Sequence, residues 1–254
     1  GLNRAEHRLH LRCELPHHTT LPLFEKLVGR EPVSLVSLMD HSPGQRQFAN
    51  IEKYREYYQG KYSLNDAEMA RYEEEQLALA AQWSQPNRLK IAAMCRDRNI
   101  ALASHDDATH DHVLESHRLG SVIAEFPTTF EAAEASRRHG MNVLMGAPNI
   151  VRGGSHSGNV AASKLASLGL LDILSSDYYP ASLLDAAFRV ADDEGNRFTL
   201  PQAIRLVTKN PATALNLHDR GEIAEGKRAD LVLAHRKGEH VHIDHVWRQG
   251  KRVF

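Results

Sequence analysis

Short, mostly apolar runs recur along the chain, and a helical pattern follows most of them. The six runs span residues 8–14, 33–41, 100–107, 121–127, 141–148 and 171–178. Each has the length and composition of a strand that is buried on both faces of a parallel sheet. Thr129–His139 and Ser157–Leu168 have apolar residues at helical spacing, and Gly140 and Gly169 follow them as C-terminal caps. The alternation predicts an α/β fold, either a doubly wound sheet or a (β/α)8 barrel.

Two regions depart from this alternation. A long polar, aromatic-rich insertion lies between His41 and Ile100, and its Glu- and Ala-rich part (Tyr72–Trp83) predicts a solvent-facing helix. The insertion is either a structural addition or a functional one, as a lid over the active site or an oligomer contact. Beyond the barrel-like part, the turn residues predict short β-strands. We therefore expect a partial barrel over residues 1–218 and a small β element over 219–254.

Composition and charge exclude several classes of protein. The 254 residues include 31 Lys and Arg against 32 Asp and Glu, a formal net charge of -1 that argues against a nucleic-acid-binding module. No apolar run approaches the ~18 residues of a membrane span, so no membrane partner is expected. Two cysteines, Cys13 and Cys95, cannot form a disulfide framework and suit a reducing cytoplasm.

Polar residues gather where the predicted strands end. The clusters are Glu14, Asp40–His41, His105–Asp107, Asn149 followed by Arg152, and Asp177. In α/β barrels the active site lies at the C-terminal ends of the strands, so these side chains are expected to converge. Imidazole nitrogens and carboxylate oxygens suit a divalent metal ion such as zinc or manganese. The sequence, which holds 16 histidines, therefore predicts a metal site.

The densest cluster is Ser104–His110 (SHDDATH). His105 ends an apolar run and is the best candidate ligand. Asp106 and Asp107 compete for two roles: one orients a histidine, and the other caps the helix expected to begin near Ala108.

A glycine-rich segment, Pro148–Val160, follows another predicted strand. Its glycines, including Gly153 and Gly154, allow close backbone approach, and a following helix would offer free N–H groups. Arg152 and His156 add donors that suit phosphate oxygens. The segment is either a flexible turn or a phosphate-binding loop, and its place at a strand end favours the phosphate loop. Arg46 is a candidate second phosphate clamp.

The C-terminal third carries the motifs LVTKNPATALNL (206–217) and GEIAEGKRADLVL (221–233), which resemble the closing signature of the amidohydrolase superfamily. Across the whole chain, HLRCELPHHT, LMDHSPGQRQF, ASHDDAT, EFPTT, MGAPNIVRGGSHSGN and SSDYYP are similar to segments of one family within it, the diphosphatases of the carbon–phosphorus lyase pathway. This resemblance implies a (β/α)8 barrel of the amidohydrolase type. It also implies metal-dependent hydrolysis of α-D-ribose 1-methylphosphonate 5-triphosphate to the 5-phosphate and pyrophosphate, in phosphonate utilisation.

The resemblance also implies a difference. Members carry a His-x-His or similar metal pair on the first barrel strand, and nothing before Arg8 matches it. The six strands then correspond to barrel strands three to eight, and the chain to the C-terminal two-thirds of the enzyme. The implied metal site is incomplete in this way, and both an active and an inactive chain are open.

The implied mechanism assigns roles to particular residues. Glu14, His41, His105 and Asp177 are the expected metal residues, with Asp177 also the general base. The phosphate and pocket residues are expected to be Arg46, Asn149, Arg152, Gly153, Gly154, His156 and Tyr178. The partner is a phosphorylated small molecule, and a homo-oligomer is an open alternative. Two other functions are also open: a different amidohydrolase reaction, such as deacetylation or deamination, and a non-catalytic scaffold.

Overall fold

The computed structural model describes residues 4–29, 32–48, 50–154, 158–238 and 240–254, and the chain divides into two compact units. One unit is Arg8–Met141, and the other combines Gly1–His7 with Asn142–Phe254. The boundary expected after residue 218 therefore falls inside the second unit.

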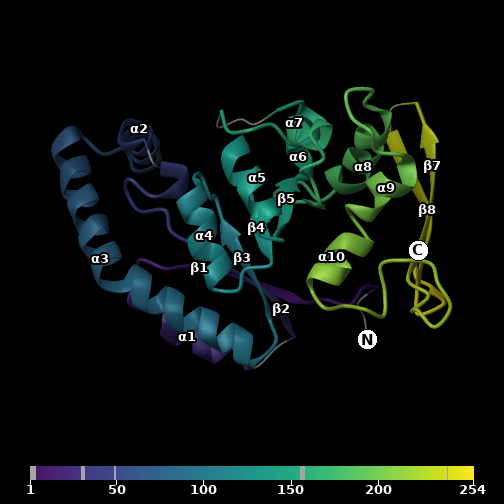
Figure 1. The fold of residues 1–254 in the computed structure, drawn as a ribbon, viewed down its shortest axis with the longest axis horizontal. Coiled ribbons are helices and arrows are strands. Elements are labelled where there is room, and N and C mark those ends of the chain that lie inside the picture. The colour runs from purple at the N-terminus through teal and green to yellow at the C-terminus, as the bar shows by residue number, and fades with distance from the viewer. Residues whose placement is uncertain (1–3, 30–31, 49, 155–157, 239) are drawn as a thin grey trace. The chain divides into compact units, whose positions relative to one another are not determined.

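The unit of residues 8–141 contains four parallel strands that pair in the order of the sequence. They are β1 (Leu9–Glu14), β2 (Val33–Met39), β3 (Ala101–His105) and β4 (Ile123–Glu125). A doubly wound sheet would reverse its strand order at a switch point, whereas barrel strands follow one another around the sheet. This unit therefore has the strand order of a barrel, as the sequence predicts, with helices between its strands (Figure 1).

α1 (Thr20–Val28) connects β1 to β2, the insertion connects β2 to β3, and α4 (His110–Arg118) connects β3 to β4; α5 (Phe130–Arg138) follows β4. A core cluster that includes Leu15, Phe24, Val36 and Ile91 joins β1 and β2 to α1 and to α3 (Asp66–Asp97). These strands are apolar because helices cover them.

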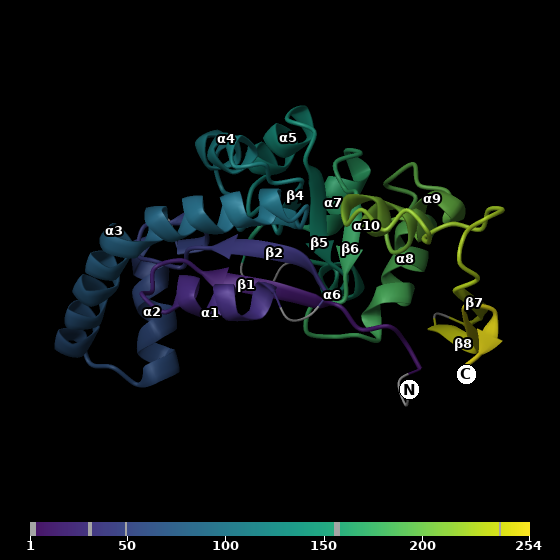
Figure 2. The same cartoon turned by 90° about the horizontal axis from the view of Figure 1, so that it is seen from below.

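The insertion forms a short 3-10 turn, η1 (Arg46–Phe48), and two helices, α2 (Ile51–Tyr62) and α3 (Asp66–Asp97). A capping box between Asn65 and Glu68 fixes the start of α3. Figure 2 shows that α3 is bent, and it contains Pro86, which removes one helical hydrogen bond. The helix predicted for Tyr72–Trp83 is confirmed as part of α3.

The other unit contains a parallel pair, β5 (Asn142–Gly146) and β6 (Ile173–Ser175). Its helices are α6 (Ala147–Arg152), α7 (Ala162–Ser167), α8 (Ser182–Asp192), α9 (Leu200–Arg205) and α10 (Lys209–Ala214). The C-terminal residues form the predicted small antiparallel sheet of β7 (Leu231–Lys237), β8 (His240–Arg248) and β9 (Lys251–Arg252).

Helix boundaries test the sequence predictions closely. Gly140 and Gly169 have left-handed φ angles of 75° and 69° just after α5 and α7, as expected of C-terminal caps. The helix expected over 157–168 begins only at Ala162, because Ala161 is extended with ψ 138°.

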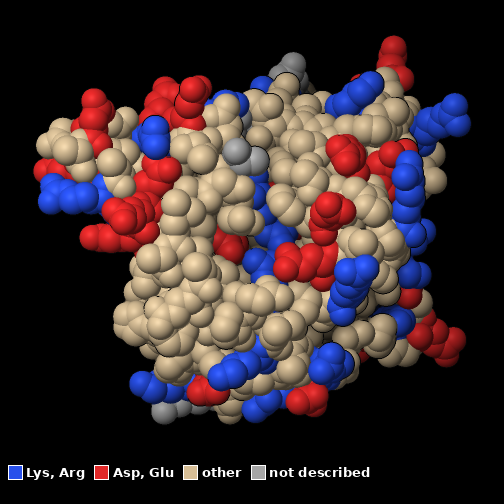
Figure 3. Space-filling model, turned by 60° about the vertical axis from the view of Figure 1, so that its left-hand side comes forward, with Lys and Arg blue, Asp and Glu red and all other residues tan. Residues whose placement is uncertain are grey.

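Acidic and basic side chains are interspersed on the face shown in Figure 3, in keeping with the formal net charge of -1. Among the described residues, no helix combines the length and apolar character that crossing a bilayer requires.

Candidate metal centre

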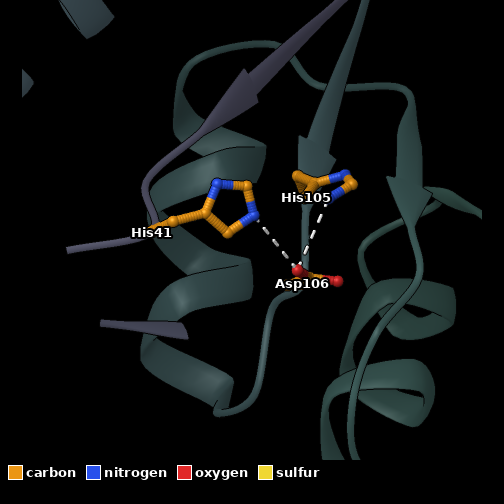
Figure 4. A group of neighbouring side chains, drawn as sticks. All are labelled: His41, His105 and Asp106. Carbon is orange, nitrogen blue, oxygen red and sulfur yellow. Dashed lines mark ion pairs between the residues drawn. The ribbon is translucent and has the colours of Figure 1, made fainter. Parts of the chain in front are cut away.

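His41, His105 and Asp106 come together at the C-terminal ends of β2 and β3, with both imidazole rings beside the Asp106 carboxylate (Figure 4). Asp106 Oδ2 lies 3.7 Å from His41 Nε2 and 3.4 Å from His105 Nε2. Two ligands at ~2.0–2.1 Å from a tetrahedral zinc ion are themselves ~3.3 Å apart. The spacing therefore fits a shared divalent ion, and this is the one such group found among the described residues.

The backbone positions the carboxylate of this group. Asp106 follows the last residue of β3 with φ 56°, and its N–H donates to the carbonyl of Glu125 at 3.0 Å. Asp tolerates this left-handed conformation better than most residues do. Neither Asp106 nor Asp107 caps α4, because Thr109 holds that position and accepts from the His112 N–H.

Two further carboxylates, those of Glu14 and Glu125, contact the Nδ1 atoms of the two imidazole rings. Glu14 Oε2 lies 2.6 Å from His41 Nδ1, and Glu125 Oε2 lies 2.8 Å from His105 Nδ1. Such contacts fix ring orientation and leave Nε2 to the metal. Glu14 also accepts from the His41 N–H through Oε1. These contacts are those of an orienting residue, and the role of Glu14 as a ligand stays a prediction.

Sequence reasoning did not select Glu125, although it ends the run SVIAE as His105 ends IALASH. It also left out Arg12, whose Nη2 lies 3.1 Å from His105 Nε2. Because a guanidinium only donates, His105 Nε2 is the acceptor and Nδ1 carries the hydrogen toward Glu125. In this tautomer the lone pair of His105 Nε2 accepts from Arg12, and the same lone pair would bind a metal ion.

Charge within the site shifts two ionisation equilibria. Burial lowers the pKa of His41, but hydrogen bonds to Asp106 and Glu14 outweigh it and raise the pKa to about 9. Burial also disfavours the charged form of Glu125, which would raise its pKa. The contacts of Glu125 with His105 outweigh burial and lower the pKa. A metal ion must displace the extra proton of His41, because ligating imidazole is neutral.

Arg46, a predicted phosphate clamp, is buried among carboxylates. Only 3% of the residue is exposed; it pairs with Asp107, and its Nη2 lies 2.9 Å from Glu115 Oε2. Arg88 shares Glu115 at 2.9 Å and reaches Asp40 at 3.4 Å. Burial, with the neighbouring Arg88, lowers the pKa of Arg46 to about 10. This network, not a phosphate, neutralises the Arg46 guanidinium.

The remaining predicted site residues fall in the unit of residues 142–254, apart from His156, which lies outside the described residues. Exposed Arg152, at the end of α6, donates through Nη1 to the Tyr178 hydroxyl at 3.3 Å. The structure thus brings these two predicted residues together.

The glycines of the loop after α6 use their N–H groups internally. Gly153 and Gly154 donate to the carbonyls of Ile150 and Asn149 at 3.2 and 2.9 Å. Asn149 Oδ1 in turn accepts from the Ala162 N–H at 3.0 Å. The free N–H groups are expected from the sequence at the start of the following helix, where the Ala162 N–H is taken by Asn149 Oδ1.

Asp177 follows β6 with a left-handed φ of 47°. A Cβ placed on Gly146 would lie 3.4 Å from its Oδ2, so the carboxylate lies close to the end of β5. A strained conformation at a strand end is common at functional sites.

Comparison with known proteins places these features in a family. Residues 38–254 match the model of a family described as Amidohydrolase family. The chain is 88% identical to alpha-D-ribose 1-methylphosphonate 5-triphosphate diphosphatase from Escherichia coli (strain K12), over all of the chain and 67% of that protein's length. It is also 34% identical to adenine deaminase from Ligilactobacillus salivarius (strain UCC118), over 45% of the chain and 21% of that protein.

Among solved structures, the chain is similar to an adenosine deaminase from Xanthomonas campestris with bound zinc, with a TM-score of 0.48 and 18% identity over 71% of this chain and 56% of that one. A guanine deaminase from C. acetobutylicum gives a TM-score of 0.46 and 11% identity over 97% of this chain and 71% of that one. These scores are too low to bear on the site.

Proposed function

Since the chain belongs to the amidohydrolase family, we propose that the protein is a metal-dependent diphosphatase that hydrolyses a ribose 5-triphosphate to the 5-phosphate and pyrophosphate. The similarity to the E. coli enzyme supports α-D-ribose 1-methylphosphonate 5-triphosphate as the substrate, and phosphonate utilisation as the setting. The observation that carries the proposal is the approach of His41 Nε2, His105 Nε2 and Asp106 Oδ2.

The three converging groups would hold a divalent ion such as zinc or manganese. A bound ion of this kind acidifies water toward neutral pH and polarises a phosphoryl oxygen. Glu14 and Glu125 keep the two imidazole rings in their binding orientation through Nδ1.

In the reaction, a water oxygen bonds to the α-phosphorus, and the bond from that phosphorus to the bridging oxygen breaks. Asp177 is our candidate general base, which takes the proton of the attacking water. Arg152 would neutralise charge on the phosphoryl groups and on the departing pyrophosphate. We also propose a cytoplasmic location, which the free, buried Cys13 and Cys95 support.

Phosphorus NMR tests the proposed reaction directly. Metal-loaded protein incubated with ribose 5-triphosphate should release pyrophosphate and ribose 5-phosphate in equal amounts. Chelator-treated protein is the control and should release neither. Orthophosphate as the first product, or no product from the metal-loaded protein, would contradict the proposal.

Deamination is a second candidate, because of the 34% identity with an adenine deaminase over part of the chain. The same protein incubated with adenine would then release ammonia. We expect no ammonia, because an uncharged base makes no use of Arg152.

A further inference from the structure

A recess of about 360 Å³ lies beside the metal centre within the unit of residues 8–141. Glu14 and His41 line it from the ends of β1 and β2. Tyr58, Tyr62, Tyr72 and Gln76 line it from α2 and α3, and residues of the segment 16–20 complete it. Ligand clefts typically begin at ~300 Å³, so the recess is large enough for a small ligand or one part of a substrate.

Packing fixes the insertion helices against the site. Phe48, Tyr54 and Met69 form a buried cluster beneath α2 and α3. The Phe48 ring meets the His41 ring edge-on, with centroids 6.1 Å apart. The tyrosines of the recess are therefore held at a set distance from a metal-binding residue, which a merely peripheral insertion does not require.

The tyrosines of the recess differ from the buried one in the same insertion. Tyr54 is 1% exposed and serves as core, whereas Tyr62 is 49% exposed. The Tyr58 and Tyr62 rings stack at 5.8 Å and 29°. The Tyr72 ring lies 5.4 Å from the Tyr58 ring and 5.8 Å from the Tyr62 ring, so the three rings form one contiguous group.

The side chains that line the recess suit the sugar of a sugar triphosphate better than its phosphate groups. None of the described residues that line the recess is lysine or arginine, and Glu14 adds a carboxylate, so the lining is poorly suited to a triphosphate. The nearby Lys61 ammonium lies over the tyrosine rings, 5.2 Å from the Tyr62 centroid. Aromatic faces, hydroxyl groups and the Gln76 amide instead suit a ligand with apolar C–H faces and several hydroxyl groups. A pentose ring has both features.

We propose that this recess binds the pentose of the substrate, and that the α2–α3 insertion thereby supplies sugar specificity to the metal centre. This inference rests on the proposed function, since it assigns one part of that substrate to one part of the site. Tyr62 and Gln76 are the specificity-determining residues.

The test compares Tyr62→Ala and Gln76→Leu with Tyr57→Ala. Tyr57 is the matched control, because it lies on α2, is 51% exposed and does not line the recess. Each metal-loaded variant is assayed with ribose 5-triphosphate and with inorganic triphosphate, which has no sugar. We expect the recess variants to lose ~3- to 10-fold in kcat/KM for ribose 5-triphosphate, mainly through KM, at unchanged rates with inorganic triphosphate. The control should match the parent with both substrates.

Equal losses with both substrates, or no loss with either, would overturn the pentose assignment. Calorimetric binding of D-ribose 5-phosphate to the protein, with inorganic phosphate as competitor, separates this inference from the proposed reaction. Binding that weakens in Tyr62→Ala and resists inorganic phosphate supports the pentose site even if no triphosphate is hydrolysed. Binding that is unaffected by both recess variants overturns it, whatever the activity.

Discussion

Replacing Glu125 by Gln tests whether the carboxylates that contact the imidazole Nδ1 atoms support metal binding by His41, His105 and Asp106. The Glu125 carboxylate lies 2.8 Å from His105 Nδ1, and its side chain is 6% exposed, so water cannot take its place. Gln keeps the size and one acceptor oxygen but removes the charge that favours the ring orientation. Loss of such an outer partner typically costs 10- to 100-fold in metal affinity, which corresponds to ~1.4–2.7 kcal/mol.

The same change at Glu14 gives a comparison within the site. Glu14 contacts His41 Nδ1 at 2.6 Å, but its side chain is 42% exposed. Solvent screens this contact and can replace it, so Glu14→Gln should cost less than Glu125→Gln. If Glu14 were itself a metal ligand, as the sequence predicts, the order of the two effects would be reversed.

The assay titrates zinc into metal-free protein in competition with a chromophoric chelator, and circular dichroism checks the fold. Glu25→Gln, at an exposed position of α1, is the control and should bind zinc as the parent does. A folded Glu125→Gln variant with parental zinc affinity would refute the role of Glu125 and weaken the case for His105 as a ligand.

Four further substitutions test individual residues. His105→Ala should lower bound metal and activity together, as elemental analysis after gel filtration would show; unchanged stoichiometry would make His105 structural. Asp177→Asn should keep most of the metal and lose turnover by at least ~100-fold, and a near-normal kcat would remove its assignment as base. Arg152→Lys should lower kcat/KM for triphosphate ~10- to 150-fold at constant metal content, because an ammonium cannot make a bidentate contact; parental kinetics would leave Arg152 a surface residue. Arg46→Met should cost ~3–5 kcal/mol in urea unfolding, since it leaves the buried Asp107 carboxylate without its ion-pair partner; intact stability with a raised KM would restore the phosphate clamp.

The strands could be predicted because a strand that is buried on both faces has a continuous run of apolar residues in the sequence. Leu35, Val36 and Leu38 are buried as that pattern requires. Helix ends were harder to predict, since Ala161 and Ala162 look alike in sequence, and only the first of them is extended.

The site residues show what local patterns leave out. His41 and His105 could be predicted because a polar residue that directly follows a buried strand lies at the edge where strands end. Glu14 could be predicted on the same ground, but Glu125 was not selected, and neither contact could be assigned, since Glu125 lies 20 residues from His105 and Glu14 lies 27 from His41. Arg46 is a candidate phosphate clamp in sequence, but its partner Glu115 is 69 residues away, and folding leaves only 3% of Arg46 exposed.

The charges around the metal centre favour binding of the metal ion before binding of the substrate. Asp106, Glu14 and Glu125 place three carboxylates around two imidazoles, and a cationic side chain, Arg12, contacts the His105 ring. Such a set attracts a divalent cation and repels a triphosphate. His41 keeps a proton in the metal-free chain because the same carboxylates raise its pKa to about 9, and a bound ion replaces that proton with a larger positive charge. The anionic substrate therefore meets a favourable field only after the metal is in place, and the proposed pentose recess beside the centre would add affinity through its hydroxyl and aromatic groups.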